Sequence, residues 1–476
     1  MRDRLPQRYV VGAVFVAGMF LNILDTTIVN VALPTLAEEF DVGTASIDWV
    51  VLGYLVSLAA FIPASGWIGD RFGTKRTYLF ALAVFTTASA LCGLAQSLDQ
   101  LVAFRILQGV GGGMLTPVGT AMLFRAFPPA ERAKASRVLI IPTVMAPALG
   151  PIIGGFLVDD LSWRWIFFVN LPVGAGAFVF GSLFLHEHRE PRAGRFDLPG
   201  FVLAGAGLPL VLYALGEGPS AGWLSREVAT TGILGLVLFA ALVRVELGKE
   251  HPMLQLRLLG NRLFRATNTA ALFGYGAFIG FLFIAPLYLQ EARGLSASQS
   301  GLTTFPEALG VLVSTQFVSR LYMHVGPRRL MAGGLAMVSA IVLLFTQVDL
   351  GTNLWTVRLL MFLLGAAMAF MMMPVQAATF ATIAPADTGQ ASAIFSTQRQ
   401  VAAALGVAIL ATTLSARLPD GVPTPSEQLS AFRGAFLAAA LLALVGSVAS
   451  LAIRDADAAG TMHPKAAPPE GATAAA

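Results

Sequence analysis

The chain has 476 residues, of which 56% are hydrophobic and only 12% are charged, and its mean hydropathy is +0.73. This number of charged side chains is too small to cover the surface of a soluble protein of this length. The composition therefore excludes an ordinary soluble enzyme and indicates an integral membrane protein. The single cysteine, Cys92, excludes an intrachain disulfide framework and a multi-cysteine metal site.

Apolar stretches long enough to cross a bilayer as helices recur fourteen times along the chain. The first is too long for a signal peptide and lacks a small-residue cleavage site after it, so we expect it to remain as a membrane span. The predicted spans are residues 9–33, 47–68, 77–96, 101–124, 135–158, 165–185, 198–216, 227–245, 266–289, 300–322, 329–347, 354–377, 389–414 and 432–453.

The 31 Lys and Arg residues are divided unevenly between the two sets of predicted loops. With a cytoplasmic N-terminus, the inner loops and adjoining span ends hold 23 of them and the outer ones five, while Arg105, Arg358 and Arg399 lie deeper within spans. Because basic residues accumulate on the cytoplasmic side of membrane proteins, this asymmetry predicts that both termini are cytoplasmic. It also accounts for the pI near 9.4 and the net charge of +4 without a nucleic-acid partner.

The two halves of the chain resemble each other at a nearly constant offset. Residues 73–76 follow the second span as residues 326–329 follow the tenth, and Arg105 precedes Arg358 by the same 253 residues. Six spans need roughly 190 residues, so this offset leaves room for two extra helices, which we assign to spans seven and eight. The predicted organisation is a six-helix bundle over 1–190, two inserted helices over 191–250, a second six-helix bundle over 251–454 and a disordered, Ala- and Pro-rich cytoplasmic tail over 455–476.

Five sequence motifs are similar to motifs that one known family carries in the same helices and loops. They are LDTTIVNVALP (24–34), GWIGDRFGTKR (66–76), LVAFRILQGVGGG (101–113), APALGPIIGG (146–155) and WRWIFFVNLPVG (163–174). Together they resemble the major facilitator superfamily, specifically its fourteen-helix EmrB/QacA-like drug:proton antiporters. The resemblance implies an all-α membrane protein of two six-helix bundles plus two inserted helices, placed in the bacterial inner (plasma) membrane. It also implies multidrug efflux and antibiotic resistance, driven by the proton gradient without a cofactor.

Asp25 stands in the middle of the first span, where an unpaired charge costs several kcal/mol. Arg105 and Glu307 lie early in spans four and ten, which run in the opposite direction, so the three groups are expected at a similar depth. Proton antiport needs a buried acid that alternately holds a proton and faces a cationic substrate. Asp25, Glu307 and Arg105 are therefore the predicted proton-coupling residues, and Asp25, Glu307 and Arg399 the predicted cavity residues. The alternatives are a static Asp25–Arg105 pair that only fixes helix packing and a bystander role for Glu307.

Two motifs are expected to control conformation. For the loop motif the resemblance implies a conformational latch, whereas simple positive-inside anchoring is the alternative; its residues are Gly66, Asp70, Arg71, Gly73, Lys75 and Arg76. Thr74 stands where that family usually has a basic residue, so one charge of the family's network is missing here. For the antiporter motif, small residues on one helix face let a neighbouring backbone approach closely, and we expect a gating interface, with ordinary packing as the alternative. Its residues are Gly150, Pro151, Gly154 and Gly155.

Other features of the sequence narrow the function. The Met run 371–373 is expected in the core or facing lipid rather than lining a cavity, and Arg358 is expected to snorkel to the interface. The absence of a G-x-x-x-x-G-K-[ST] loop argues against ATP-driven transport, and the five histidines make no metal motif. The favoured function is a monomeric, proton-coupled exporter of lipophilic, cationic or neutral compounds, with the substrate, protons and membrane lipids as its partners. A dedicated exporter of a metabolite, siderophore or lipid, a membrane-bound transferase, and a transporter-like sensor are the alternatives.

Overall fold

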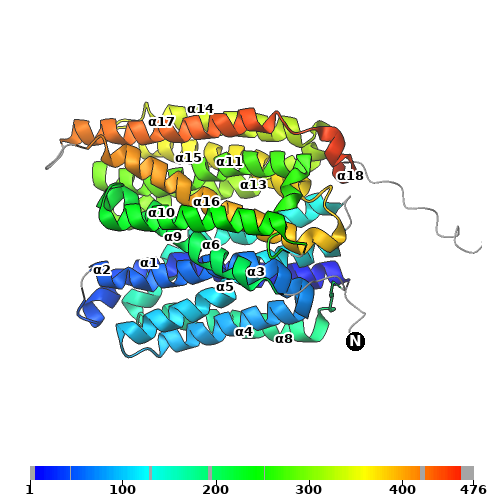
Figure 1. Ribbon diagram of the computed structural model, residues 1–476. Coiled ribbons are helices and arrows are strands. Elements are labelled where there is room, and N and C mark those ends of the chain that lie inside the picture. Colours follow the sequence, from blue (N-terminus) through cyan, green and yellow to red (C-terminus); the bar gives the residue numbers. More distant parts are fainter. Residues whose placement is uncertain are drawn as a thin grey trace, which may run out of the picture.

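The computed structural model describes residues 6–42, 44–127, 131–190, 196–250, 252–418 and 424–462, and over these residues every regular element is a helix (Figure 1). Residues of the first half form α1 (Gln7–Glu39), α2 (Thr44–Ile47), α3 (Trp49–Phe72), α4 (Thr74–Gly93), α5 (Leu98–Ala126), α6 (Arg132–Asp160), α7 (Trp165–Phe168) and α8 (Asn170–Phe184). The inserted pair is α9 (Leu198–Ala221) and α10 (Arg226–Gly248).

The second half repeats this arrangement of long antiparallel helices. Its elements are the 3-10 helix η3 (Leu256–Gly260), α11 (Arg262–Leu287), the π-helix η4 (Tyr288–Ala292), α12 (Ala297–Thr304), α13 (Pro306–Val325), α14 (Pro327–Phe345), α15 (Leu354–Thr379), the 3-10 helix η5 (Pro385–Asp387), α16 (Thr388–Ser415), α17 (Pro425–Ser450), the 3-10 helix η6 (Asp455–Ala458) and α18 (Ala459–Met462).

Within the described part of the chain, twelve helical segments are long and apolar enough to cross a membrane. The two other predicted spans are occupied by α6, of 29 residues, and by α12 with α13, so every predicted span coincides with helix. The largest errors are at span ends. α1 continues six residues past the predicted end at Leu33, and α17 starts seven residues before the predicted start at Phe432. At Thr424 a capping box with Glu427 satisfies the first backbone N–H groups, so polar residues there begin the helix before its apolar stretch.

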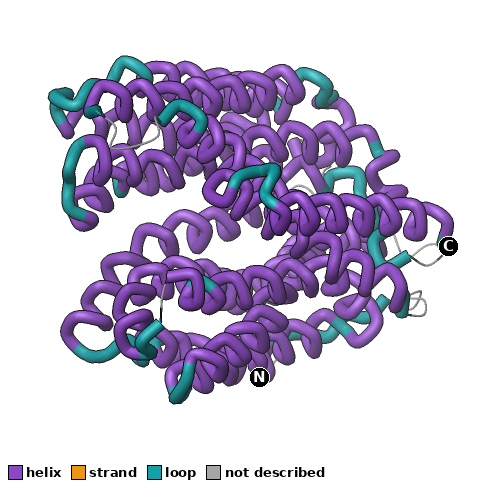
Figure 2. Tube along the Cα trace, turned by 60° about the vertical axis from the view of Figure 1, so that its left-hand side comes forward, coloured by secondary structure: helices purple, strands orange, loops and turns teal. Residues whose placement is uncertain are grey.

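The helices gather into two groups (Figure 2), and α9 and α10 of the inserted pair lie between them (Figure 1). α1 packs against α5, α6 and α8, and α11 packs against α15, α16 and α17. α9 contacts α3 of the first half and α16 of the second. In the turn after α9, Trp223 Nε1 donates a hydrogen bond to Thr412 Oγ1 of α16 at 3.0 Å. The predicted domain boundaries at 190/191 and 250/251 border residues 191–195 and 251, which lie outside the described residues.

One end of the molecule carries matching glycine turns in the two halves. We call it the basic end and define it by the turns at Gly73 and Gly326, beside the N-terminus and α18 in Figure 1. Both glycines have positive φ, +99° and +83°, which disfavours any other residue. Glu187 accepts a hydrogen bond from Lys75 N beyond the first turn, and Asp455 accepts one from Arg328 N beyond the second. The repeat predicted from sequence therefore extends to the acid that caps each turn.

The prediction of a disordered tail from Asp455 is wrong for its first eight residues. Residues 455–462 form η6 and α18, and the Tyr322 hydroxyl lies 2.6 Å from Thr461 Oγ1. Asp455 accepts a hydrogen bond from Arg328 N, and Ala458 is fully buried in the core. Composition did not reveal these contacts because they are made with residues more than a hundred positions away in the sequence. Residues 463–476 lie outside the described residues.

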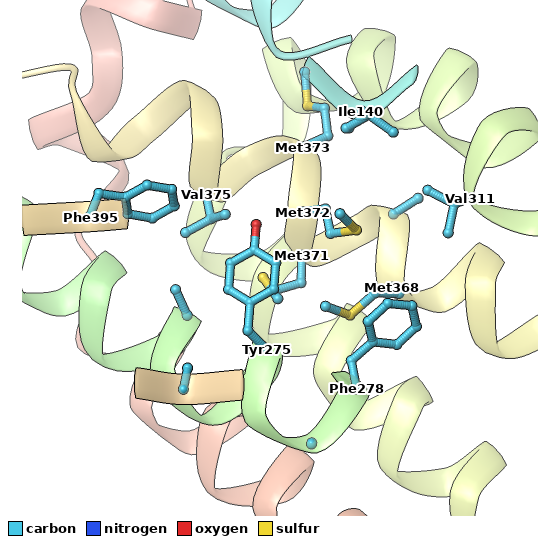
Figure 3. Packing of buried hydrophobic residues seen from close by; sticks show 14 of the residues in the cluster. Ile140, Tyr275, Phe278, Val311, Met368, Met371, Met372, Met373, Val375 and Phe395 are labelled. Carbon is cyan, nitrogen blue, oxygen red and sulfur yellow. The ribbon is translucent and has the colours of Figure 1, made fainter. Parts of the chain in front are cut away.

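The Met run lies in the core of the second half, as predicted. Met371, Met372 and Met373 of α15 are at most 4% exposed. Met371 and Met372 lie near Tyr275 of α11 (Figure 3). Figure 3 also shows Ile140 of α6 beside Met373, so this core reaches the first half. The flexible thioether side chains fill irregular space between these helices.

Buried charges join the inserted helices to the chain that follows them. Asp197 accepts a hydrogen bond from Gly200 N at 2.8 Å, which caps α9, and an ion pair links it to Lys249 beyond α10. Glu246 of α10 accepts from Leu254 N at 3.0 Å. Asp197 is 5% and Glu246 1% exposed. This buried cluster therefore holds α9 and α10 against the segment of chain that follows α10.

Replacing Gly200 with alanine should break this cluster. A Cβ there would collide with Glu246 Oε1 and lie 2.8 Å from Asp197 Oδ2. Displacing either carboxylate leaves buried donors unpaired, so we expect a loss of about 1–3 kcal/mol in the free energy of unfolding. Tryptophan fluorescence during thermal unfolding of the purified protein measures it. The matched change Gly216→Ala in the same helix meets nothing within 4 Å and should not destabilise; equal melting temperatures for the two variants would contradict the assignment.

Candidate functional site: a buried charge cluster and a gate

Asp25 lies in the closed interior of the first half. Its Oδ2 accepts a hydrogen bond from Arg105 Nη1 at 2.5 Å, and its Oδ1 accepts from Gln108 Nε2 at 2.8 Å and from Asn170 Nδ2 at 3.2 Å. Asp25 is 0% and Arg105 1% exposed. α1, α5 and α8 therefore bring one carboxylate and three donating side chains to one point. The charge is fully compensated, which a buried ion requires.

Arg105 is held from several sides. Its Nη1 also donates to Gln108 Oε1 at 2.7 Å, and its Nε donates to the Val50 carbonyl at 3.0 Å. Its guanidinium carbon lies 4.2 Å from the centroid of the Tyr54 ring, a stacking arrangement that favours a desolvated cation. The structure thus brings Asp25 and Arg105 together, as their positions in the spans predicted. A role for Asp25 in contacting substrate requires that this cluster first open.

Sequence reasoning missed two members of the cluster. Gln108 follows Arg105 by three residues and so shares its helix face, which is a signal that the sequence did contain. Asn170 begins α8 and also donates to Ser89 Oγ at 3.0 Å. In the sequence Asn170 was visible only as an amide between two apolar stretches. The packing of α8 on α1 shows that this amide donates to Asp25.

Glu307 and Arg399 lie outside this cluster. Glu307 is in the first turn of α13, eighteen residues before the end of that helix, which lies at the basic end. Asp25 is likewise eighteen residues from the start of α1, which lies at the same end. At 1.5 Å per residue both are about 27 Å from that end, but in different halves. Arg399 is eleven residues into α16, hence only about 17 Å from it. Arg358, at the opposite end of α15, lies 4.7 Å from the Trp355 ring centroid and is partly exposed, as snorkelling predicts.

Asp70 of the loop motif joins the two halves at the basic end. It accepts a hydrogen bond from Arg125 Nη2 of α5 at 2.9 Å, and Arg125 Nε donates to the Pro385 carbonyl of the second half at 3.3 Å. A Cβ on Gly389 would lie 2.7 Å from Asp70 Oδ1, so the carboxylate abuts the second residue of α16. A negative charge at a helix N-terminus is stabilised by the helix dipole. This contact has the geometry of a latch.

Gly66 also meets the second half, because a Cβ there would lie 2.8 Å from the Gly389 carbonyl oxygen. The remaining loop-motif residues act within the first half. Lys75 Nζ donates to the carbonyls of Ser182 and Leu185 at 2.8 and 2.7 Å, where α8 ends. Arg76 forms an exposed ion pair with Glu187 at 3.7 Å, and Arg71 is exposed. These residues tie the loop to the end of α8, so the motif divides into a latch between halves and an anchor within one half.

The antiporter motif packs against α1 near Asp25. A Cβ on Gly150 would collide with Thr27, and one on Gly154 would lie 2.9 Å from Ile28 Cγ1. Gly155 has nothing within 4 Å, and the side chain of Pro151 lies outside the described side chains. The two glycines that make close contacts therefore meet α1 of their own half, two and three residues from Asp25, which is the close approach expected of small residues. The gating role of this contact stays a prediction.

Comparison with known proteins agrees with this architecture. The Major Facilitator Superfamily model matches residues 15–406 and, in a second match, 267–475. The Multidrug resistance protein B homolog of Mycobacterium tuberculosis is 34% identical over 423 residues, covering 86% of this chain and 78% of that protein. The Putative multidrug resistance protein MdtD of Serratia proteamaculans is 30% identical over 434 residues, covering 91% of each.

A solved structure supports the same fold. The crystal structure of the human organic anion transporter MFSD10 (TETRAN) superposes with a TM-score of 0.67, covering 94% of this chain and all of that one, at 16% sequence identity. The two bundles, the glycine turns at the basic end and the family match agree with one another. The chain is a multi-pass membrane transporter that belongs to the Major Facilitator Superfamily.

Proposed function

We propose that the chain is a proton-coupled exporter of lipophilic, drug-like compounds in the bacterial plasma membrane, with the basic end and both termini in the cytoplasm. The relatives named as multidrug resistance proteins support drug efflux. The excess of Lys and Arg in one set of loops supports the orientation.

The observation that carries proton coupling is the complete pairing of Asp25 inside the first half. While it is ionised, its carboxylate holds Arg105, Gln108 and Asn170. A proton on Asp25 would cancel the charge that Arg105 faces and leave a guanidinium buried without its counter-ion. Breaking a buried pair in this way costs about 3–5 kcal/mol, enough to shift an equilibrium between two conformations. Protonation is therefore proposed to loosen the contact between α1 and α5.

The latch provides the second conformational element. With Asp70 against the start of α16, the halves are held together at the basic end. Alternating access then requires this end to part while the opposite end closes, so that substrate is taken up from the cytoplasm and released outside. We propose that protonation of Asp25 and opening of the latch are successive parts of one cycle, with no cofactor.

Reconstituted vesicles test the proposal. Vesicles containing the purified protein are loaded with a lipophilic dye, and an inward or outward proton gradient is imposed. Gradient-dependent movement of the dye, accompanied by opposite movement of protons reported by a pH-sensitive dye, is expected. Equal dye movement with and without the gradient would refute proton coupling, and the absence of movement across a broad panel of compounds would favour a dedicated exporter or a sensor.

A further inference from the structure

Arg399 is a cation in the interior of the second half for which the described residues supply no counter-ion. It is partly exposed and lies about 17 Å along α16 from the basic end. It makes no hydrogen bond or ion pair with any described residue, whereas Arg105 in the first half makes three hydrogen bonds, one of them within its ion pair with Asp25. An unpaired guanidinium at this depth is costly unless something else meets its charge.

A buried hydroxyl, that of Tyr275, lies at nearly the same depth as Arg399. Tyr275 of α11 is 3% exposed, its hydroxyl has no hydrogen-bond partner, and it interacts electrostatically with Arg399. It lies thirteen residues into α11, about 20 Å from the basic end, which is the depth of Arg399 within one helical turn. α11 and α16 are pressed together beside them, because a Cβ on Gly406 would collide with the Gly276 backbone. In Figure 3 the Tyr275 hydroxyl points away from its own helix toward α15.

Further polar groups without partners stand next to Arg399 in the sequence of α16. Both side-chain polar atoms of Gln398 and the hydroxyl of Thr397 are buried and lack hydrogen-bond partners. Asp70, the carboxylate placed against α16, is bonded to Arg125 and lies at Gly389, about 15 Å along the helix from Arg399. Asp70 is therefore too far away to neutralise the guanidinium.

The position of α16 makes this cluster reachable by a transported molecule. α16 packs against α3 and α5 of the first half and against α11 and α17 of the second, so it lies between the bundles. Substrate sites of such repeats lie at the interface of the halves near the middle of the membrane. Guanidinium and hydroxyl donors together suit a carboxylate or a similar anionic group, which accepts several hydrogen bonds from arginine.

We propose that Arg399 and Tyr275 form a subsite for the anionic group of an amphipathic exported compound, so that the substrate class includes lipophilic organic acids. This rests on the proposed export function and narrows it. It departs from the sequence expectation of cationic or neutral substrates, because Asp25, one of the two acids expected in the cavity, is already occupied by Arg105. The other acid, Glu307, lies about 10 Å farther from the basic end than Arg399. An anionic lipid headgroup is the other source of the same chemistry.

Binding measurements on the purified full chain test the subsite without a proton gradient. In phosphatidylcholine nanodiscs, three probes with one pyrene body compete with one another: 1-pyrenebutyrate, 1-pyrenebutanol and a pyrenebutyl trimethylammonium ion. The native chain should prefer the acid over the alcohol by about tenfold, the weight of a hydrogen bond to a charged group. Arg399→Gln should abolish that preference while binding the alcohol as the native chain does, which also shows that the variant is folded. Tyr275→Phe should reduce the preference several-fold.

Controls separate this proposal from its competitors. Arg358→Gln changes an arginine outside the cluster and should keep the native preference. An equal affinity of the native chain for acid and alcohol, or an acid preference retained in Arg399→Gln, would overturn the subsite. Phosphatidylglycerol nanodiscs provide the lipid arm: loss of acid binding there, dependent on Arg399, would assign the site to lipid headgroups and overturn the substrate assignment. A chain that prefers the acid but moves no protons in vesicles would instead refute only the proposed coupling.

Discussion

Asp25→Asn is expected to abolish proton-driven efflux, reducing it to the level of vesicles without protein, while downhill exchange of substrate survives. Asparagine removes the group that gains and loses a proton but keeps the size of the side chain and one accepting oxygen. Arg105 keeps its hydrogen bonds to Gln108 and to the Val50 carbonyl, so the helices retain most of their contacts. Parallel measurements of dye movement with and without a proton gradient check that proton-driven efflux is lost while downhill exchange remains.

A change of Arg105, the ion-pair partner of Asp25, serves as the comparison for this result. Arg105→Ala leaves Asp25 ionised and without its counter-ion in a site that is 0% exposed, so the free energy of unfolding should fall by about 3–5 kcal/mol and both kinds of transport should fail. If Asp25→Asn loses both kinds of transport as well, the pair is structural. A lower melting temperature alone does not show this, because asparagine, like protonated Asp25, leaves the guanidinium without a counter-ion. Full proton-coupled efflux by Asp25→Asn would move the coupling site elsewhere, with Glu307 the next candidate.

Gly66→Ala is expected to eliminate net transport by preventing closure at the basic end. A Cβ there would lie 2.8 Å from the Gly389 carbonyl oxygen and 3.3 Å from Ala393 Cβ, so backbone on the other half would have to move away. Parting the halves also removes Gly389 from the Asp70 carboxylate, and the contact with the start of α16 is lost. A cysteine at Asp387, beside the latch, should then react faster with a thiol reagent in Gly66→Ala than in the native background.

Gly69→Ala is the control, one turn farther along α3. Its nearest neighbour would be Val118 at 3.7 Å, an ordinary contact, so both transport and thiol reactivity should stay near native values. Native transport in Gly66→Ala, with normal protein levels, would show that the contact at Gly389 does not control the cycle. Asp70→Asn should have a smaller effect than Gly66→Ala, because it removes the charge at the start of α16 without forcing the halves apart.

Element positions were predictable because they depend on local properties of the chain. An apolar stretch must be helical to cross lipid, since every backbone group has to be paired within the segment. The predicted ends were wrong where polar residues continue a helix, as at Glu38 and Glu39 of α1 and at Ser426 of α17. There, capping and tertiary contacts outweigh hydropathy.

The candidate site was predictable only in part. Asp25 and Arg105 stood out because a charge in a span needs a reason and their depths matched. Gln108 and Asn170 did not, because an amide in a span carries no comparable cost and its partner depends on the rotation of each helix about its axis. The roles of the antiporter glycines were hidden for the same reason: spacing shows that Gly150 and Gly154 share a face, but not that this face meets α1.

The sequence alone determined that the chain is a membrane protein, where its helices lie, that its halves repeat, and which family it resembles. These properties follow from composition, periodicity and motifs, which are read along the chain. Only the tertiary structure decided which charges are paired: Asp25 with Arg105 inside one half, Asp70 against α16 between halves, and Arg399 with no counter-ion among the described residues. Pairing between groups tens or hundreds of residues apart depends on helix packing and rotation, which a single sequence does not record.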